Sequence, residues 1–142
     1  MKISARNVFK GTVSAVKEGP VSAEVDITLP GGDTLVAVIT EQSLESLGLV
    51  KGKEIVALVK APLVMLMTDG SGYRLSARNT LQGTVKTLEQ GMINTEVVMT
   101  LPGGTDLYAI VTKEAAASLD LKVGSPVTAI IKASHIIVGV PA

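Results

Sequence analysis

The sequence predicts an all-β protein made of two tandem, small five-stranded barrels, each with one short helix. Three observations lead to this fold class. The chain matches itself when it is shifted by 72 residues. Each half has short runs of alternating apolar and polar residues, separated by turns rich in Gly and Pro, which is typical of strands. Each half also has one segment with the spacing of a short helix.

The internal repeat sets the domain organisation. Roughly 25 of 64 positions are identical when Ile3–Leu66 is aligned with Leu75–Val138, which indicates a duplication. The segment Thr68–Arg74 between the copies contains Asp-Gly and Ser-Gly pairs, which are typical of a linker. We therefore expect one domain over residues 1–68, a linker over 69–74 and a second domain over 75–142.

Five strands are expected in the first repeat. The turn Pro30–Asp33 predicts that its second and third strands form a hairpin. The alternating patterns place the strands at 7–16, 22–29, 34–40, 54–60 and 63–67.

One short helix is expected after the third strand. Leu44 and Leu47 lie at helical spacing, Thr40 can cap the first turn, and Gly48 ends the segment. Five short strands with a helix after the third predict a small, partly closed barrel of the OB type. The second repeat has every one of these elements.

Composition excludes several classes of protein. There is no Cys, one His, no Trp, one Phe and two Tyr, and 13 basic residues balance 13 acidic ones. Without Cys, neither disulfides nor thiolate metal sites can form. Zero net charge argues against nucleic-acid and membrane-surface partners. No apolar run could span a bilayer, and the N-terminus lacks the apolar core of a signal peptide, so we expect a cytoplasmic protein.

Each repeat is small and almost lacks aromatic residues. A domain of about 65 residues buries only a modest part of its surface, so it is marginal alone. We therefore expect contacts between the domains and between chains, and hence a homo-oligomer.

Polar residues that both repeats keep indicate a site. Ser4-Ala5-Arg6-Asn7 recurs as Ser76-Ala77-Arg78-Asn79, and Lys60-Ala61 recurs as Lys132-Ala133. Serine, arginine and lysine are hydrogen-bond donors, and two cations could neutralise a dianion. The residue types leave an alternative open, in which Arg6 and Arg78 pair with Glu24 or Glu96.

These motifs resemble the Mop domain of molbindins. SARN-x-x-x-G-x-V starts each copy, T-x-x-S-x-x-x-L-G-L-x-x-G lies in the middle of the first copy, and A-x-x-KA follows near each end. The resemblance covers the whole chain twice. It implies a cytoplasmic protein that binds molybdate, and tungstate as well, for storage or homeostasis. It also implies an OB-like fold and a homotrimer.

The resemblance carries over to named positions. It implies oxyanion binding between domains of the oligomer, without direct protein–metal ligands and without a catalytic cofactor. Ser43 is a further candidate in the first copy alone, since the second copy has Ala115 there. Ser134 is a candidate in the second copy alone, since Pro62 lacks an N–H group. The candidates common to both copies are Ser4, Ala5, Arg6, Lys60 and Ala61, with Ser76, Ala77, Arg78, Lys132 and Ala133.

A second pair of loops is a weaker candidate for oxyanion binding. The segments Gly19–Ser22 and Gly91–Asn94 could bind an anion through the backbone or could simply turn the chain. The candidate residues are Gly19, Val21, Ser22, Gly91, Ile93 and Asn94.

Molybdate fits this set of donors. It is a tetrahedral dianion with four acceptor oxygens, so its site needs donors and positive charge and no catalysis. An enzyme is not expected, because the chain has no paired carboxylates, His/Asp/Glu cluster or nucleophile elbow, and His135 has no counterpart in the first copy. The alternative function is an OB-fold module for single-stranded nucleic acid, which would need aromatic stacking platforms and a basic groove.

Overall fold

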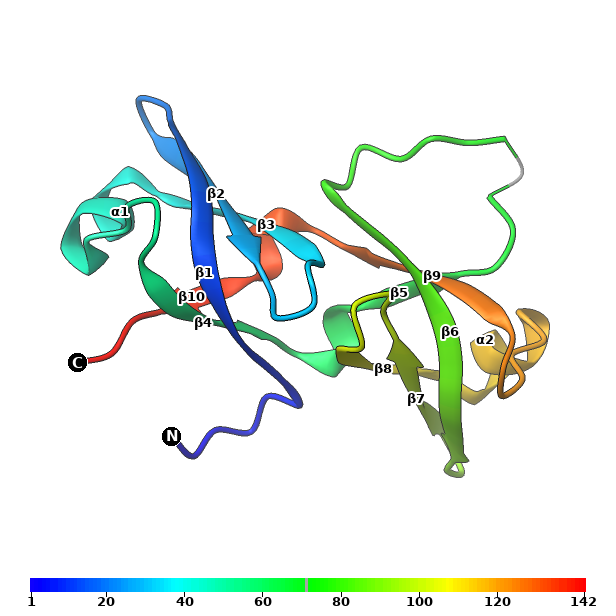
Figure 1. Ribbon diagram of the computed structural model, residues 1–142. Helices are drawn as coiled ribbons and strands as arrows, with labels where there is room; N and C mark the ends of the chain where they lie inside the picture. The colour runs from blue at the N-terminus through cyan, green and yellow to red at the C-terminus, as the bar shows by residue number, and fades with distance from the viewer. Residues whose placement is uncertain (71) are drawn as a thin grey trace.

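The structure, a computed structural model, describes residues 1–70 and 72–142. It contains two five-stranded antiparallel sheets that lie side by side (Figure 1). The first repeat forms β1 (Asn7–Glu18), β2 (Ser22–Thr28), β3 (Thr34–Thr40), α1 (Glu41–Leu47), β4 (Glu54–Val59), the 3₁₀ turn η1 (Ala61–Leu63) and β5 (Met65–Met67). The second forms β6 (Asn79–Gln90), β7 (Asn94–Thr100), β8 (Asp106–Thr112), α2 (Lys113–Ser118), β9 (Pro126–Ile131), η2 (Ala133–His135) and β10 (Ile137–Gly139). The predicted all-β fold with one short helix in each repeat is confirmed.

The fifth strand of each sheet comes from the other repeat. The first sheet has the order β10-β4-β1-β2-β3, and the second has the order β5-β9-β6-β7-β8. Ile137 of β10 pairs with Leu58 of β4, and Met65 of β5 pairs with Ile130 of β9. The chain therefore crosses between the sheets after β4 and again after β9. This exchange was not expected from the sequence, and the domain boundaries at 68 and 75 stay a prediction.

The ends of the predicted elements shift for local reasons. The strand expected over 63–67 begins only at Met65, because residues 61–63 form a 3₁₀ turn with Pro62 in its first positions. The helix is found where it was expected, and the Oγ1 atom of Thr40 accepts a hydrogen bond from the backbone N–H of Ser43. Gly48 ends it in the left-handed conformation with φ of 62°.

The second repeat ends its helix differently. Asp120 stands at the position of Gly48 and has a positive φ of 52°. A non-glycine residue in this region pays a steric cost, which Asp tolerates better than most. The helix α2 is also one residue shorter than α1.

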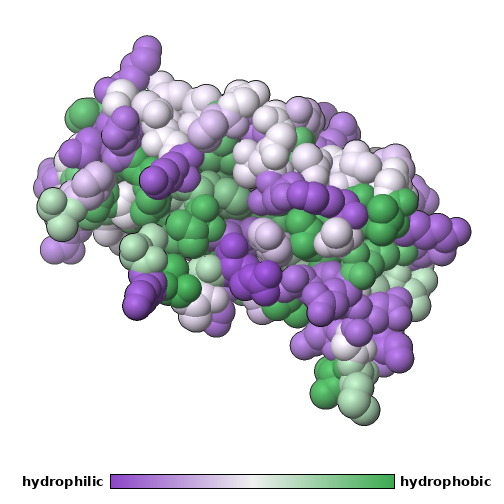
Figure 2. Space-filling view, turned by 60° about the horizontal axis from the view of Figure 1, so that its bottom comes forward, coloured by the Kyte–Doolittle hydropathy of each residue, from purple (hydrophilic) through white to green (hydrophobic). Residues whose placement is uncertain are grey.

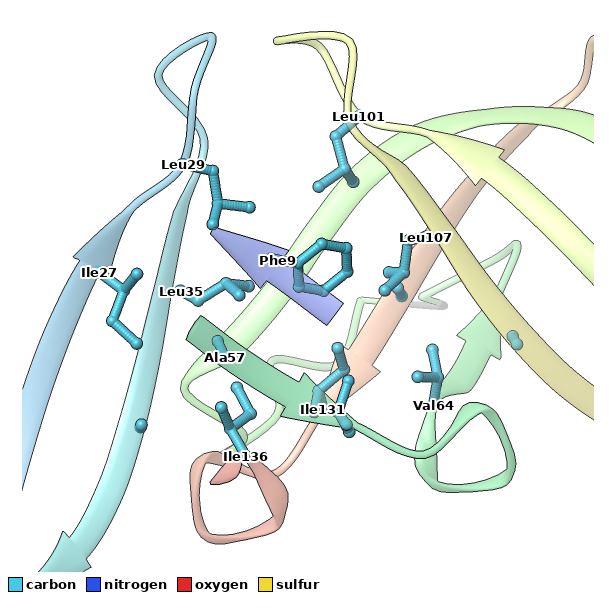
Figure 3. Packing of buried hydrophobic residues seen from close by; sticks show 14 of the residues in the cluster. Phe9, Ile27, Leu29, Leu35, Ala57, Val64, Leu101, Leu107, Ile131 and Ile136 are labelled. Carbon is cyan, nitrogen blue, oxygen red and sulfur yellow. The ribbon is translucent and has the colours of Figure 1, made fainter. Parts of the chain in front are cut away.

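The apolar core is continuous across both sheets. One cluster of buried residues includes Phe9 and Ile27 from the first repeat and Leu101, Leu107 and Ile131 from the second. Figure 3 shows Phe9 between side chains of the two repeats. The two sheets therefore share buried surface, as expected for small aliphatic domains that are marginal alone.

The two Leu-Pro-Gly-Gly turns also meet. The Oδ2 atom of Asp33 accepts a hydrogen bond of 3.0 Å from the backbone N–H of Gly103. A Cβ atom on Gly103 would lie 2.7 Å from the carbonyl oxygen of Gly31, so this contact requires glycine. Among the described residues, no helix has the length and apolar character needed to cross a bilayer.

Candidate oxyanion-binding site

Pairing of β1 with β4 brings the first set of predicted donors together. Asn7 is the first residue of β1 and pairs with Val59, the last residue of β4. Ser4, Ala5 and Arg6 therefore precede this pair, and Lys60 and Ala61 follow it. We call these five residues the first donor cluster.

Pairing of β6 with β9 assembles the second set in the same way. Asn79 pairs with Ile131, so Ser76, Ala77 and Arg78 lie at the same end of the sheet as Lys132, Ala133 and Ser134. We call these six residues the second donor cluster.

Both clusters lie where one repeat meets the other. The turn η1, which follows Lys60, packs against β8 of the second repeat. The turn η2, which follows Lys132, packs against β3 of the first repeat. Each cluster therefore faces the neighbouring sheet of the same chain.

The arginine side chains are used in ion pairs. The two guanidinium nitrogens Nη1 and Nη2 of Arg6 donate to the carboxylate oxygens of Glu96 at 2.6 and 3.3 Å. Arg78 makes the reciprocal pair with Glu24. The alternative that the residue types left open is what the structure shows for both arginines. Their charge is compensated within the chain and does not accumulate where the two sheets meet.

The lysines have no such compensation. In residues 1–70 and 72–142, the side chains of Lys60 and Lys132 take part in no ion pair or hydrogen bond, and both residues are exposed. The carboxylates of Glu24 and Glu96 go to the arginines instead. Each cluster thus keeps one free ammonium group.

Unpaired backbone donors lie beside each lysine. Within the described parts of the chain, the backbone N–H groups of Ala5, Ala61, Ala77 and Ala133 donate no hydrogen bond. Ala61 is the first residue of η1, and a helical turn leaves its first N–H groups unpaired. Together with the exposed hydroxyls of Ser4 and Ser76, these groups form two sets of donors suited to an anion.

The role of the asparagine in the SARN motif was not expected from the sequence. Asn7 is 1% exposed, and its side chain donates to the carbonyl of Tyr108 and accepts from the N–H of Tyr108, both at 2.8 Å. Asn79 makes the same two contacts with Val36, at 2.8 and 2.7 Å. These asparagines bind each sheet to the edge of the other. The signal was present, since Asn is identical in both repeats.

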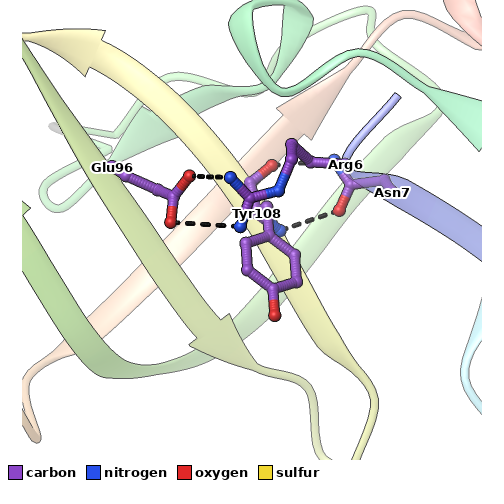
Figure 4. A network of polar contacts seen from close by, with 4 residues as sticks. All are labelled: Arg6, Asn7, Glu96 and Tyr108. Carbon is purple, nitrogen blue, oxygen red and sulfur yellow. Dashed lines mark hydrogen bonds and ion pairs between the residues drawn. The ribbon is translucent and has the colours of Figure 1, made fainter. Parts of the chain in front are cut away.

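Tyr108 was also missed. The Cζ atom of Arg6 lies 4.8 Å from the centre of its ring, and Figure 4 shows the guanidinium between this ring and Glu96. No repeat signal could have found it, because Val36 stands at the matching position in the first repeat.

The polar groups of Ser43 are used in hydrogen bonds within the helix α1 and its cap. Its N–H and hydroxyl both contact the Oγ1 atom of Thr40, and its carbonyl accepts from Ser46. All its hydrogen bonds thus serve the N-terminal turns of α1. The structure does not show Ser43 joining either donor cluster.

The second pair of candidate loops forms the tips of two hairpins. The N–H of Gly19 donates to the carbonyl of Ser22 at 2.9 Å, and that of Gly91 donates to Asn94 at 2.7 Å. Both segments therefore turn the chain, whatever else they bind. The apolar residues Met92 and Ile93 are 94% and 76% exposed. In Figure 2 the protrusion at the lower right, the hairpin of β6 and β7, ends in apolar atoms.

The two tips differ in charge. Partial burial of the Glu41 carboxylate, followed by the nearby carboxylates of Glu18 and Glu45, raises the pKa of Glu41. In the second repeat the matching residues are Lys113, Gln90 and Ala117. The second tip lacks these three carboxylates but has Glu89 and Glu114 where the first repeat has Lys17 and Gln42, so acidic residues lie near both tips.

The structure shows no metal-ligand cluster in the parts of the chain it describes. There, no three His, Asp or Glu side chains are grouped so that they could hold a metal ion. The Nδ1 atom of His135 is buried without a hydrogen-bond partner. A donor set made of lysine, hydroxyls and N–H groups suits an oxyanion and not a bare cation.

Known proteins share this arrangement of repeats. The family described as the TOBE domain matches residues 3–66 and, a second time, residues 75–138. The chain belongs to the TOBE-domain family. Its two TOBE repeats account for both sheets and both donor clusters.

Several relatives of this TOBE-domain chain are named for molybdenum. It is 43% identical, over 99% of its length, to the molybdenum transport protein ModE of Herbaspirillum seropedicae and covers 52% of that protein. It is also 43% identical to the molybdenum-pterin-binding protein MopA of Rhodobacter capsulatus, over 99% of its length and 53% of MopA. The chain thus spans about half the length of the curated relatives it matches. Neither relative is named as an enzyme.

One solved structure matches this chain over nearly its whole length. The cytoplasmic molybdate-binding protein ModG, solved with molybdate bound, superimposes with a TM-score of 0.95 and 66% sequence identity. The match covers 99% of this chain and 100% of the ModG chain. The predicted resemblance to the Mop-domain molbindins is confirmed.

Proposed function

We propose that this chain binds molybdate, and tungstate as well, at the two donor clusters, and that it serves molybdenum storage or homeostasis in the cytoplasm. The observation that carries the proposal is the pair of uncompensated lysines, each beside unpaired N–H groups and a serine hydroxyl. The likeness to ModG over the whole chain supports the same ligand and the same compartment.

The charges fit a dianion held by more than one residue. One free ammonium group per cluster leaves the second charge to the N–H groups, the hydroxyls and any partner chain. Charge-assisted hydrogen bonds of this kind are stronger than neutral ones. Glu24 and Glu96 hold the guanidinium groups. Arg6 and Arg78 therefore contribute to the site through the position of their backbone and not through a free charge.

We also propose that the chain assembles as a homotrimer in which neighbouring chains complete the sites. Apolar side chains remain exposed near both clusters, including Ile3, Leu63 and Leu75 at 50%, 37% and 50%. Light scattering should give the mass of three chains. A stable monomer at micromolar concentration would contradict this assembly.

The hairpin tips are a further candidate for anion binding. If a tip binds molybdate, replacing its polar residue by alanine, Ser22→Ala in the first tip or Asn94→Ala in the second, should lower the number of bound ions. Unchanged ion numbers in both variants would show that the tips only turn the chain.

The nucleic-acid alternative is not favoured. Phe9 is buried, and Tyr108 is covered on one face by Arg6. Among the described aromatic residues, Tyr73 alone is largely exposed, at 77%. Single-strand binders instead present several stacking rings along a basic groove.

A competition experiment tests the proposed function. The protein is dialysed against molybdate, tungstate or sulfate, alone and in mixtures, and the retained molybdenum, tungsten and sulfur are measured. We expect molybdate and tungstate to be retained in the presence of excess sulfate, because the size of the site favours these larger ions. Retention of sulfate in preference to molybdate, or of neither, would overturn the proposal.

A further inference from the structure

The two junctions between the sheets are almost identical, and they differ in one ring. At the first junction Arg6 pairs with Glu96 and Asn7 bonds to the backbone of Tyr108. At the second, Arg78 pairs with Glu24 and Asn79 bonds to the backbone of Val36. Since Tyr108 and Val36 are matching positions, the comparison isolates the effect of the aromatic side chain.

The ring of Tyr108 contacts Arg6, the last residue of the Ser4–Arg6 segment of the first donor cluster. A guanidinium within about 6 Å of a ring centre is attracted by the ring face. The Arg6 Cζ atom lies 4.8 Å from the centre of the Tyr108 ring, and Glu96 fixes the same guanidinium by two hydrogen bonds (Figure 4). Among the described residues, Arg78 has an ion pair but no contact with an aromatic ring.

Two consecutive residues are thus attached to the same tyrosine. Asn7 binds its backbone and Arg6 lies on its ring. Together these contacts set the direction in which the chain approaches β1, and they limit the motion of Ser4 and Ala5 just before it. A ligand site whose donors are already in place loses less entropy on binding.

We propose that Tyr108 is a positioning residue for the first donor cluster, where its ring, acting through Arg6, holds the Ser4–Arg6 segment in the conformation that binds the oxyanion. The inference rests on the proposed function, since it concerns the same cluster. It makes the two clusters unequal. The first gains order from Tyr108 but has Pro62 without an N–H, whereas the second has Ser134 but no ring.

Reciprocal substitutions test this role. Tyr108→Val gives the first junction the residue of the second, and Val36→Tyr places a ring near Arg78. Each is combined with a lysine substitution that weakens one cluster, so that a titration with molybdate reports on the other. Lys132→Met leaves the first cluster to be measured, and Lys60→Met leaves the second.

The expected result is specific to one cluster. With Lys132→Met as background, Tyr108→Val should weaken molybdate binding about two- to fivefold, the range of an exposed cation–π contact. With Lys60→Met as background, the same substitution should leave the affinity unchanged. Tyr108→Phe keeps the ring and should bind as tightly as the parent. Val36→Tyr should tighten binding only at the second cluster.

Tyrosine fluorescence adds a readout that a purely structural role would not change. The chain has no Trp and two Tyr, so Tyr73→Phe leaves Tyr108 as the sole tyrosine. With Lys132→Met as background, its emission should change on titration with molybdate, at the midpoint given by calorimetry. With Lys60→Met as background, the change in emission at that molybdate concentration should disappear.

The opposing results are distinct. Equal weakening of both clusters by Tyr108→Val, together with a lower melting temperature without ligand, would show that the ring only stabilises the fold and would overturn the inference. Unchanged affinity at the first cluster would overturn it as well. If the parent protein bound no molybdate, the proposed function itself would fail. Selective weakening of the first cluster with an unchanged melting temperature would support the inference.

Discussion

The two junctions and the two hairpin tips of this chain have diverged to different degrees. At the junctions, Asn7 and Asn79 make the same pair of hydrogen bonds to the opposite sheet, within 0.1 Å of each other. At the tips, the charges have moved. Glu18, Glu41 and Glu45 of the first repeat are replaced by Gln90, Lys113 and Ala117, while Glu89 and Glu114 stand where the first repeat has Lys17 and Gln42. Identity between the repeats therefore marks the contacts that hold the two sheets together.

This contrast shows which residues of a duplicated chain can change independently in each copy. A junction contact involves one residue from each repeat, so a change in either copy disturbs both sheets. A tip residue contacts its own repeat and solvent, so its charge can change freely. The donor clusters lie between these cases, because they adjoin the junctions but differ at Pro62 and Ser134.

The largest expected effect is at the junction asparagines. Asn7→Ala and Asn79→Ala each leave a backbone N–H and a carbonyl of the other sheet without a partner, which costs about 2–4 kcal/mol of unfolding free energy. Urea denaturation should show losses of similar size for the two variants. Asn94→Ala, at an exposed tip, is the control and should change stability by less than about 0.5 kcal/mol. A large loss of unfolding free energy in only one of the two variants would show that the two asparagines are not equivalent.

The next largest effect concerns the lysines and molybdate. Lys60→Met and Lys132→Met each remove a charge-assisted contact worth about 1.5–3 kcal/mol, so affinity at the altered cluster should fall roughly ten- to a hundredfold or more. Calorimetric titration resolves the two clusters. Because neither lysine forms an ion pair in the described part of the chain, the ligand-free variants should melt as the parent does.

Lys51→Met is the matched control for this pair. Lys51 is exposed and lies in the turn before β4, outside both clusters. Its substitution should leave molybdate affinity unchanged. A lysine variant that lost ligand-free stability instead of affinity would show that the ammonium group supports the fold.

A smaller effect distinguishes the two helix ends. Asp120 has φ of 52°, where the first repeat uses Gly48 with φ of 62°. Asp120→Gly should raise unfolding free energy by about 0.5–1 kcal/mol, because it relieves the left-handed strain. The reciprocal Gly48→Asp should lower it by a similar amount. The ion pair of Asp120 with Lys122 is largely exposed and contributes little.

The smallest effect is a pH dependence at the first tip. The pKa of Glu41 is raised above its ordinary value of 4.5 by partial burial and by Glu18 and Glu45. The folded state therefore holds this proton more tightly than the unfolded state, and the stability it contributes is present at low pH and lost as pH rises above about 4.5.

Replacement of Glu41 by the neutral amide tests that sign. Glu41→Gln should melt higher than the parent at pH 7, and the difference should shrink as pH falls toward 4. Lys113→Gln, at the matching position, should show no such trend, because lysine does not titrate in this range. A difference for Glu41→Gln that grew at low pH would have the wrong sign.

Much of the fold could be predicted from local patterns. Alternation in Ser22–Thr28 and Thr34–Thr40, with the turn between them, fixes a hairpin by itself. Thr40 and Gly48 likewise mark the ends of α1. The repeat then assigns the same elements to the second half.

The exchange of β5 and β10 could not be predicted from the same patterns. The repeats are so similar that β4 and β9 offer equivalent edges, and β5 could pair with either of them. Local alternation does not distinguish a strand that pairs within its repeat from one that pairs outside it. The choice depends on the chain direction after Lys60 and Lys132, which η1 and η2 set.

The candidate site was only partly readable for a similar reason. Identity between the repeats identified Ser4, Arg6 and Lys60 as polar residues that the core does not require. It could not show that the Arg6 side chain is bound to Glu96, since that pairing spans 90 positions in the sequence. Identity between the repeats could not identify Tyr108, because the effect of its ring depends on a difference between the repeats.

The most direct test of molybdate binding at the two donor clusters is a crystal structure of this chain with molybdate, with anomalous data collected at the molybdenum absorption edge. We expect anomalous peaks beside Lys60 and Lys132, at hydrogen-bond distance from the N–H groups of Ala5 and Ala61 and of Ala77 and Ala133. Peaks found only at the hairpin tips, or elsewhere away from both donor clusters, would contradict molybdate binding at these clusters.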